Sequence, residues 1–467
     1  MTDSLSYGLP DGFPILWRDT ADPAEFQTAR DRVWNAKRTQ RSPRAIVKPK
    51  TVDEVVASVK LAERLGVRVS IRSGGHSWAL WSIREDAVLI DLVDFKHLEY
   101  EETTRIVHAS PSTTSIELAL FLESKKRFTP SGHCAGVGLG GFVLQGGMGV
   151  NARSYGYTCE YLVGLDVVTA DGEAKYCDEF ENSDLFWAAR GAGPGFPAIV
   201  TRFFFKTRPL PKLYKRNAYI WPIDMYEVVM RWLVSLTPTL SDDIEVGVTT
   251  LVPRGRDERV IIVNSTVFAE SEADALSKLE SLIKTHPSGT VMAEDCVDTS
   301  FAQEYKEAEK AVWVEGFRYI ADTVWLDQSA DVVEICKKAF TELPSKDGVA
   351  FWEPMNPVSR RPLQDMALSL QTDFYIALYA IYEHAEDDER NEKWMQEHMA
   401  ELEVHSVGTY FGDHDIAARP TKYWSNEAGE RLSAIRKTRD PKGRICGYLD
   451  AADESGVEGL ANKLKRL

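Results

Sequence analysis

The sequence contains no long apolar run and no excess of positive charge. Its apolar stretches are interrupted by charged residues or glycine well before the roughly 18 residues that a membrane-spanning helix requires. The formal net charge of the 467 residues is -16, which argues against electrostatic binding to nucleic-acid phosphates or to anionic lipid. We therefore expect neither a nucleic acid nor a membrane among the partners of this protein.

Cysteines are few, and a secretory signal is not evident. The six cysteines form no C-x-x-C pair, so we expect neither a disulfide framework nor a metal site. The N-terminal segment carries Asp3, Pro10, Asp11 and Pro14 where a signal peptide needs an unbroken apolar segment. These features predict an intracellular, cytoplasmic protein.

Length and composition predict a folded protein of two or three units. Hydrophobic residues make up 44% and charged residues 27% of the chain, as in typical globular domains. At about 150 residues per domain, this length suggests two or three domains. An apolar run that ends at Pro209 and Pro211 marks the end of the first unit. We place the units at residues 1–211, 212–405 and 406–467.

Local signals predict helices and strands in mixed order, and hence an α+β fold. Thr51 and Glu54 form a capping box before a helical pattern that stops at Gly66. Asp171 and Gly172 separate two apolar segments and predict a β-hairpin. Further strands are expected at 67–72, 198–205, 244–251, 260–268 and 374–382, and further helices at 271–284 and 421–438.

Glycine is concentrated in one short segment. Eight of the 31 glycines lie between Gly132 and Gly149. Because glycine lets backbone N–H groups approach an anion or a flat ring closely, a large cofactor would fit this segment. Gly136, Gly138 and Gly141 match the spacing of a dinucleotide-binding loop, but that motif should leave a strand and begin a helix. A glycine-rich turn without a ligand is the other alternative.

Two reactive side chains stand at glycine-rich loops. His76 follows Gly74 and Gly75, and Cys134 lies within the glycine-rich segment. A histidine and a cysteine could form a catalytic pair or part of a metal site. Because no third ligand or orienting residue stands at a recognisable spacing, the pair requires another explanation.

The sequence around both residues resembles a known family. R-S-G-G-H-S at 72–77 and G-x-C-x-x-V-G-x-G-G at 132–141 resemble the berberine-bridge-like branch of the vanillyl-alcohol-oxidase flavoproteins. The resemblance implies a FAD-binding unit of two subdomains, to which the C-terminal segment returns. It also implies a substrate domain in which helices cover an antiparallel sheet.

By the same resemblance, FAD would be held by two covalent bonds. His76 would be attached to the 8α position of the flavin, and the sulfur of Cys134 to the 6 position. Glycines beside both residues would give the flavin ring room. The further residues that the resemblance assigns to FAD binding are Arg72, Ser73, Gly74, Gly75, Ser77, Val137, Gly138, Gly140, Gly141, Ile199, Val200 and Tyr410.

The C-terminal motif departs from the family at two positions. The segment 408–415 resembles G-x-Y-x-N-Y-x-D, but Gly412 replaces the asparagine. Asp413 replaces the second tyrosine, which in the family is often part of the catalytic machinery. Another Tyr, His or carboxylate must then accept the proton of the substrate. The candidates are Tyr155, which is our first choice, and Tyr375, Tyr379, Asp413 and His414.

These features predict an oxidoreductase that oxidises a small-molecule alcohol by hydride transfer to FAD. Val137 occupies the position that borders the oxygen pocket in the family, and its small side chain favours molecular oxygen as acceptor and hydrogen peroxide as product. The substrate would be a carbohydrate, an aromatic alcohol or a secondary metabolite. The alternatives are an oxidative cyclase or dehydrogenase of secondary metabolism and a non-catalytic flavin-binding protein.

Overall fold

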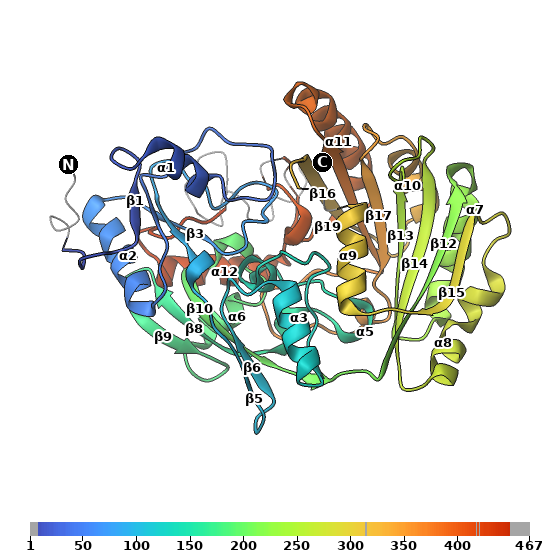
Figure 1. The fold of residues 1–467 in the computed structure, drawn as a ribbon, viewed down its shortest axis with the longest axis horizontal. Coiled ribbons are helices and arrows are strands. Elements are labelled where there is room, and N and C mark those ends of the chain that lie inside the picture. Colours follow the sequence, from blue (N-terminus) through green and yellow to red (C-terminus); the bar gives the residue numbers. More distant parts are fainter. Residues whose placement is uncertain (1–7, 313–314, 417, 420, 449–467) are drawn as a thin grey trace.

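The computed structural model describes residues 8–312, 315–416, 418–419 and 421–448. Two lobes lie side by side (Figure 1). One contains the N-terminal part of the chain and the C-terminal helix α12, and the other contains a large sheet with helices on its outer side. The predicted α+β fold, with helices covering an antiparallel sheet, is confirmed.

The first lobe contains two small sheets of four and five strands and a two-stranded sheet of β7 and β11. In the four-stranded sheet β1-β2-β4-β3, both β2 and β3 run parallel to β4. The five-stranded sheet β5-β6-β10-β8-β9 is antiparallel and includes the predicted hairpin of β8 and β9. The strands of this lobe are β1 Ile15–Trp17, β2 Ala45–Val47, β3 Val69–Arg72, β4 Val88–Asp91, β5 Leu98–Glu101, β6 Ile106–Ala109, β7 Arg127–Phe128, β8 Leu162–Thr169, β9 Ala174–Cys177, β10 Ala198–Lys206 and β11 Arg208–Pro209.

Capping residues set the ends of the main helices in this lobe. Thr51 and Glu54 form the predicted capping box of α2, and Gly66 ends that helix with a left-handed φ of 66°. The helices are α1 Pro23–Arg30, α2 Val52–Leu65, α3 Ser115–Ser124, α4 Leu139–Leu144, α5 Ala152–Tyr155 and α6 Ser183–Ala188.

No helix of the described residues combines the length and the apolar composition that a membrane span requires.

The second lobe is built on one eight-stranded sheet with the order β15-β12-β14-β13-β17-β18-β16-β19. Helices α7, α8, α10 and α11 cover one face of it and share a buried core with alternate residues of the strands. The strands are β12 Leu213–Pro222, β13 Ile244–Leu251, β14 Val260–Ala269, β15 Met292–Asp298, β16 Arg318–Leu326, β17 Val349–Pro354, β18 Phe374–Tyr382 and β19 Ser406–Gly408. The helices are α7 Tyr226–Leu236, α8 Glu272–Thr285, α9 Phe301–Ala311, α10 Val332–Thr341 and α11 Asp388–Glu403.

Strand β18 shows how the sheet divides its side chains between two faces. Ile376 and Leu378 belong to the core under the helices, whereas Tyr375 and Tyr379 belong to the core shared with the first lobe. The predicted two-residue period of this segment is therefore confirmed. This inner face of the sheet lies over the loops at 72–77 and 132–141 of the first lobe.

The C-terminal segment crosses back to the first lobe. Strand β19 still belongs to the large sheet, where it pairs with β16. Helix α12 (Asn426–Arg439) then packs on α6, and Ile445 forms a parallel bridge with Val69. The helix begins later than the predicted Thr421 because Ser425 caps it. The three unit boundaries given by the sequence stay a prediction.

Gly195 allows the end of the described chain to pack on the first lobe. A Cβ at this position would collide with the ring of Tyr448, whose hydroxyl donates a hydrogen bond to the carbonyl of Ala192 at 2.7 Å. We predict that Gly195→Ala lowers the free energy of unfolding by about 2 kcal/mol because the ring must be displaced. Tyr448→Phe, which removes only the hydroxyl, should cost about 1 kcal/mol. Urea denaturation measures both, and an unchanged midpoint for Gly195→Ala would contradict this packing role.

Candidate active site

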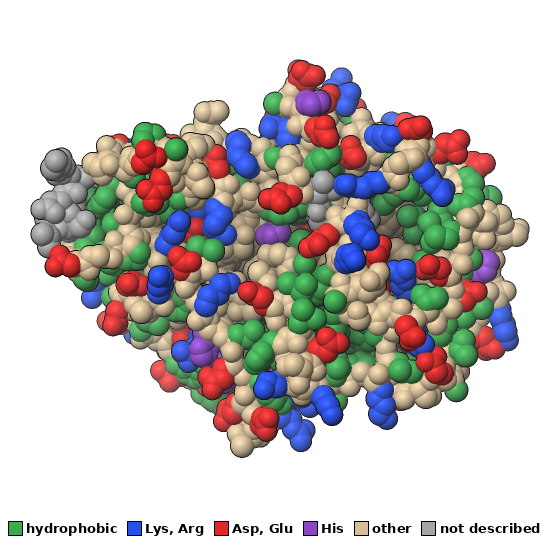
Figure 2. Space-filling model, viewed as in Figure 1, with side chains coloured by type: hydrophobic (Ala, Val, Ile, Leu, Met, Phe, Trp, Pro, Cys, Tyr) green, Lys and Arg blue, Asp and Glu red, His purple; other side chains and the backbone are tan. Residues whose placement is uncertain are grey.

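A cavity of about 800 Å³ lies between the two lobes. Its floor contains the loop at 72–77, the glycine-rich segment at 132–148 and residues 193–200. Strands β12, β13, β14, β15, β17 and β18 of the large sheet contribute the roof. Acidic and basic side chains are interspersed over the outer face shown in Figure 2. The cavity is lined by reactive side chains from both lobes.

The two glycine loops meet backbone to backbone in the floor. A Cβ on Gly74 would lie 2.5 Å from the amide nitrogen of Gly138, and a Cβ on Gly138 would lie 2.7 Å from the amide nitrogen of Gly74. Residues with side chains could not approach so closely. The segment follows an irregular stretch after β7, which is not the strand-to-helix turn of a dinucleotide-binding loop.

His76 and Cys134 lie together beside this contact. The sulfur of Cys134 lies 3.9 Å from Nδ1 of His76, and the imidazole stacks on Trp34 with ring centroids 5.6 Å apart. Burial, helped by the positive charge of Arg32, lowers the pKa of His76 to about 4. Burial raises the pKa of the Cys134 thiol to about 12. Both groups are therefore uncharged at neutral pH.

Three buried hydrogen-bond donors at the cavity have no partner within the described residues. They are Ser70 Oγ, Arg72 Nε and Trp81 Nε1. Because buried donors are normally paired, a bound group that carries acceptor atoms fits this floor. The flat ring and the phosphates of FAD suit both the donors and the glycine loops. All the residues assigned to FAD binding by sequence line the cavity, while their individual contacts with FAD stay a prediction.

Asp413 is one of the carboxylates that line the cavity. It accepts hydrogen bonds from the Tyr375 hydroxyl at 2.8 Å and from the Trp78 indole N–H at 3.1 Å. Burial raises the pKa of Asp413, although its hydrogen bonds oppose the rise. Burial and the charge of Asp413 hold the pKa values of Tyr375 and Tyr379 well above the usual range. The tyrosines therefore act as donors, and Asp413 is the group that can accept a proton.

Glu353 is a cavity residue that the motifs in the sequence did not reveal. It lies on β17 with 2% exposure, and its Oε1 has no hydrogen-bond partner within the described part of the chain. Burial, followed by repulsion from Glu245, raises the pKa of Glu353 to about 8. The signal for it was a carboxylate between Trp352 and Pro354, in an otherwise apolar strand.

An ion pair joins the glycine-rich segment to the roof. His133 Nε2 lies 2.7 Å from one carboxylate oxygen of Glu245, and the other oxygen accepts a hydrogen bond from the Asn151 N–H. Burial opposes a charge on His133, but the attraction of Glu245 prevails and raises the pKa of His133 to about 9. Because His133 directly precedes Cys134, the pair holds the cysteine loop against the large sheet.

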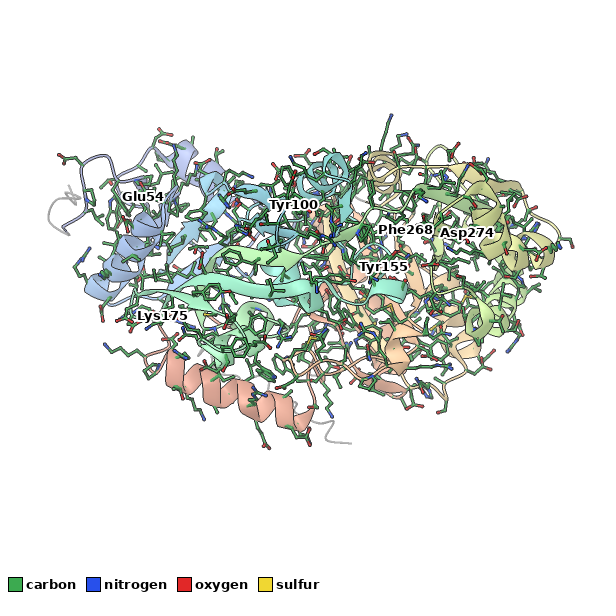
Figure 3. The ribbon with its side chains drawn as sticks, turned by 90° about the horizontal axis from the view of Figure 1, so that it is seen from below. Glu54, Tyr100, Tyr155, Lys175, Phe268 and Asp274 are labelled. Carbon is green, nitrogen blue, oxygen red and sulfur yellow. The ribbon has the colours of Figure 1, made fainter. Side chains whose placement is uncertain are left out.

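Tyr155, our first choice for the base, lies outside the cavity. Its ring packs against Phe128 and Phe268 with centroids 5.3 and 6.0 Å away, and the guanidinium of Arg208 lies 4.7 Å from its centre. Figure 3 shows Tyr155 and Phe268 next to each other. Burial raises the pKa of Tyr155 to about 12. The structure therefore places this ring in an aromatic cluster and not in the cavity that Tyr375, Tyr379 and Asp413 line.

His414 also lies away from the cavity. Its Nδ1 lies 2.6 Å from a carboxylate oxygen of Asp322, and its Nε2 lies 2.7 Å from the Tyr423 hydroxyl. Both ring nitrogens are engaged and the side chain is fully buried. Of the two neighbouring candidates for the base, only Asp413 lines the cavity.

Comparisons with known proteins identify the family. Residues 43–178 match the FAD binding domain family. The chain is 46% identical to the FAD-linked oxidoreductase janO of Penicillium janthinellum over 442 residues, which cover 94% of this chain and 98% of the relative. The chain belongs to the berberine-bridge-like branch of the vanillyl-alcohol-oxidase flavoproteins. This flavoprotein is thus a FAD-linked oxidoreductase, as the motifs predicted.

Solved structures of the same fold agree with this assignment. Glucooligosaccharide oxidase from Acremonium strictum is 21% identical with a TM-score of 0.81, and the match covers 96% of the present flavoprotein and 97% of that chain. The BBE-like 1 protein of Physcomitrella patens is 18% identical with the same TM-score, over 95% and 98% of the two chains. These likenesses establish the fold of the flavoprotein.

The ion pair between His133 and Glu245 should make the stability of the flavoprotein depend on pH. Because the pKa of His133 is raised from 6.5 to about 9, its contribution is complete below pH 6.5 and is lost as the pH rises through 9. We predict that Glu245→Gln destabilises the protein most near the lower end of this range. The difference from the unmodified protein should shrink above pH 9, as measured by urea unfolding across the range.

Glu294→Gln provides the matched control. Glu294 pairs with Arg216 at 2.9 Å, and an arginine does not titrate in this range, so its effect should stay constant with pH. Parallel pH profiles for Glu245→Gln and the control would contradict a charged His133.

Proposed function

We propose that this flavoprotein is an oxidase that converts an alcohol and molecular oxygen into a carbonyl compound and hydrogen peroxide. The observation that carries the proposal is the Asp413 carboxylate, which faces the same cavity as His76 and Cys134. Bound FAD would supply the hydride acceptor and deliver the electrons to oxygen. The residues of the chain would hold FAD, bind the substrate and move its proton.

His76 and Cys134 would attach the flavin ring at its 8α and 6 positions. They come from different loops, yet their reactive atoms lie 3.9 Å apart, so one ring system can reach both. A glucooligosaccharide oxidase of the same fold carries a 6-S-cysteinyl, 8α-N1-histidyl FAD. The low pKa of His76 keeps a nitrogen lone pair free for bond formation.

Asp413 would accept the hydroxyl proton of the substrate as the hydride leaves. A base works best when its pKa lies near the working pH, and burial moves the pKa of Asp413 in that direction. The hydrogen bonds from Tyr375 and Trp78 would fix the carboxylate at the cavity wall. Asp413 would thus take the role that a tyrosine has elsewhere in the family.

The cavity favours a largely apolar alcohol, such as a secondary metabolite, over an oligosaccharide. Ile220, Leu251, Ile262 and Phe351 give part of the roof an apolar surface on which a ring system can pack. Polar side chains beside them, such as Asn217, Thr249 and Asn264, offer hydrogen bonds that would orient the substrate. The unpartnered oxygen of Glu353 would accept one hydrogen bond from the substrate. The small side chain of Val137 in the floor would leave oxygen a path to the flavin.

Acid precipitation tests the attachment. We predict that the unmodified protein, His76→Ala and Cys134→Ala all keep their yellow colour in the precipitate, because one covalent bond suffices to retain FAD. The double variant should release the flavin into the supernatant. Release from the unmodified protein would contradict covalent attachment.

Turnover of the substituted proteins tests the base. We predict that Asp413→Asn lowers kcat by about 100-fold or more, with the flavin content unchanged, because the proton acceptor is lost. Activity of the unmodified protein should fall as the pH drops through the raised pKa of Asp413, and the variant should lack this dependence. Peroxide release across a panel of apolar alcohols and oligosaccharides measures both effects.

Tyr155→Phe provides the comparison for Asp413→Asn. This substitution removes a hydroxyl group outside the cavity, so kcat should stay within about twofold of the unmodified protein. Full activity in Asp413→Asn, or loss of activity in Tyr155→Phe alone, would contradict the assignment of the base.

A further inference from the structure

A second cluster of ligating side chains lies outside the cavity, at the hairpin of β5 and β6. Figure 1 shows this hairpin projecting from the lower edge of the first lobe. His97, Glu99 and His108 each offer one ligand atom, and these three atoms lie within 4.8 Å of one another. None of the three residues lines the cavity, so the cluster is independent of the proposed oxidase site.

The register of the hairpin brings the three side chains together. Glu99 stands directly opposite His108 in the antiparallel pair, which places their side chains on the same face. His97 precedes Glu99 by two residues and so lies on that face as well. The rings of His97 and His108 are 6.4 Å apart and inclined by 30°. Only strand pairing joins these residues, which explains why no metal motif is visible in the sequence.

One ligand atom of the cluster lacks a partner. His97 Nε2 is buried and makes no hydrogen bond within the described residues. It lies 3.8 Å from a carboxylate oxygen of Glu99. Two ligands of a tetrahedral zinc ion, each about 2.0–2.1 Å from the metal, are about 3.4 Å apart. A small movement of either side chain would therefore let both atoms bind one ion.

We propose that His97, Glu99 and His108 bind a divalent transition-metal ion, with Zn²⁺ as the best match. Two imidazoles and one carboxylate are a known zinc ligand set, whereas Ca²⁺ and Mg²⁺ prefer oxygen ligands. The bound ion would satisfy the unpartnered nitrogen of His97 and clamp β5 to β6, with water in the remaining position.

The balance of charges around the cluster is compatible with binding a cation. Arg202 on β10 lies 3.7 Å from a carboxylate oxygen of Asp166 on the neighbouring strand β8, so these two charges offset each other. The positive charge near the cluster is thus offset before the ion binds.

Calorimetric titration of the chelator-treated holoprotein with Zn²⁺ tests this site. We expect one Zn²⁺ per chain, and a melting temperature that rises when Zn²⁺ is added, because the ion binds only the folded hairpin. His97→Ala and His108→Ala should each weaken Zn²⁺ binding by about tenfold or more and abolish the rise in melting temperature. Glu99→Gln, which keeps the size of the side chain, should also weaken binding.

His405→Ala is the matched control, because it removes an exposed histidine of the second lobe. It should leave Zn²⁺ affinity unchanged, and a cooperative urea-unfolding transition in every variant reports that the protein is folded. The proposal is overturned if the unmodified protein shows no saturable Zn²⁺ binding. It is equally overturned if binding survives in both His97→Ala and His108→Ala, because the ion would then sit elsewhere.

Discussion

Direct backbone contact between two glycine loops is the constraint on which the site depends. Because no side chain separates Gly74 from Gly138, the loops from distant parts of the chain lie against each other. His76 and Cys134, which are 58 positions apart in sequence, are thereby held with their reactive atoms 3.9 Å apart. A side chain at either glycine would separate the loops and the two groups with them. The floor of the cavity therefore depends on the absence of side chains at Gly74 and Gly138.

Ionisable side chains across the cavity from the glycine loops form the rest of the site. Glu353 and Asp413 are carboxylates enclosed by protein, and burial raises the pKa of each. Glu245 stands close to them but is balanced by His133, which remains a cation up to a pKa of about 9. This ion pair couples the two lobes mechanically, because one partner belongs to the cysteine loop and the other to the large sheet. The positive charge of His133 opposes the rise in the pKa values of Glu353 and Asp413, but burial outweighs it.

Features set by a short stretch of chain were predictable from the sequence, and features set by contact between lobes were not. The capping box at Thr51 and the strand alternation around Tyr375 depend on local residues, and both occur as predicted. Tyr155 was the first choice for the base, but Phe268 from the other lobe packs against it, so the sequence could not show that its ring lies outside the cavity. Glu353 belongs to no motif and becomes notable only when β13 and β17 pair and place it near Glu245.

The most direct test of this account is mass spectrometry of the digested flavoprotein. The account predicts one flavin that links the peptide containing His76 to the peptide containing Cys134, because both groups face the same ring at a separation of 3.9 Å. Recovery of both peptides with unmodified side chains would contradict it.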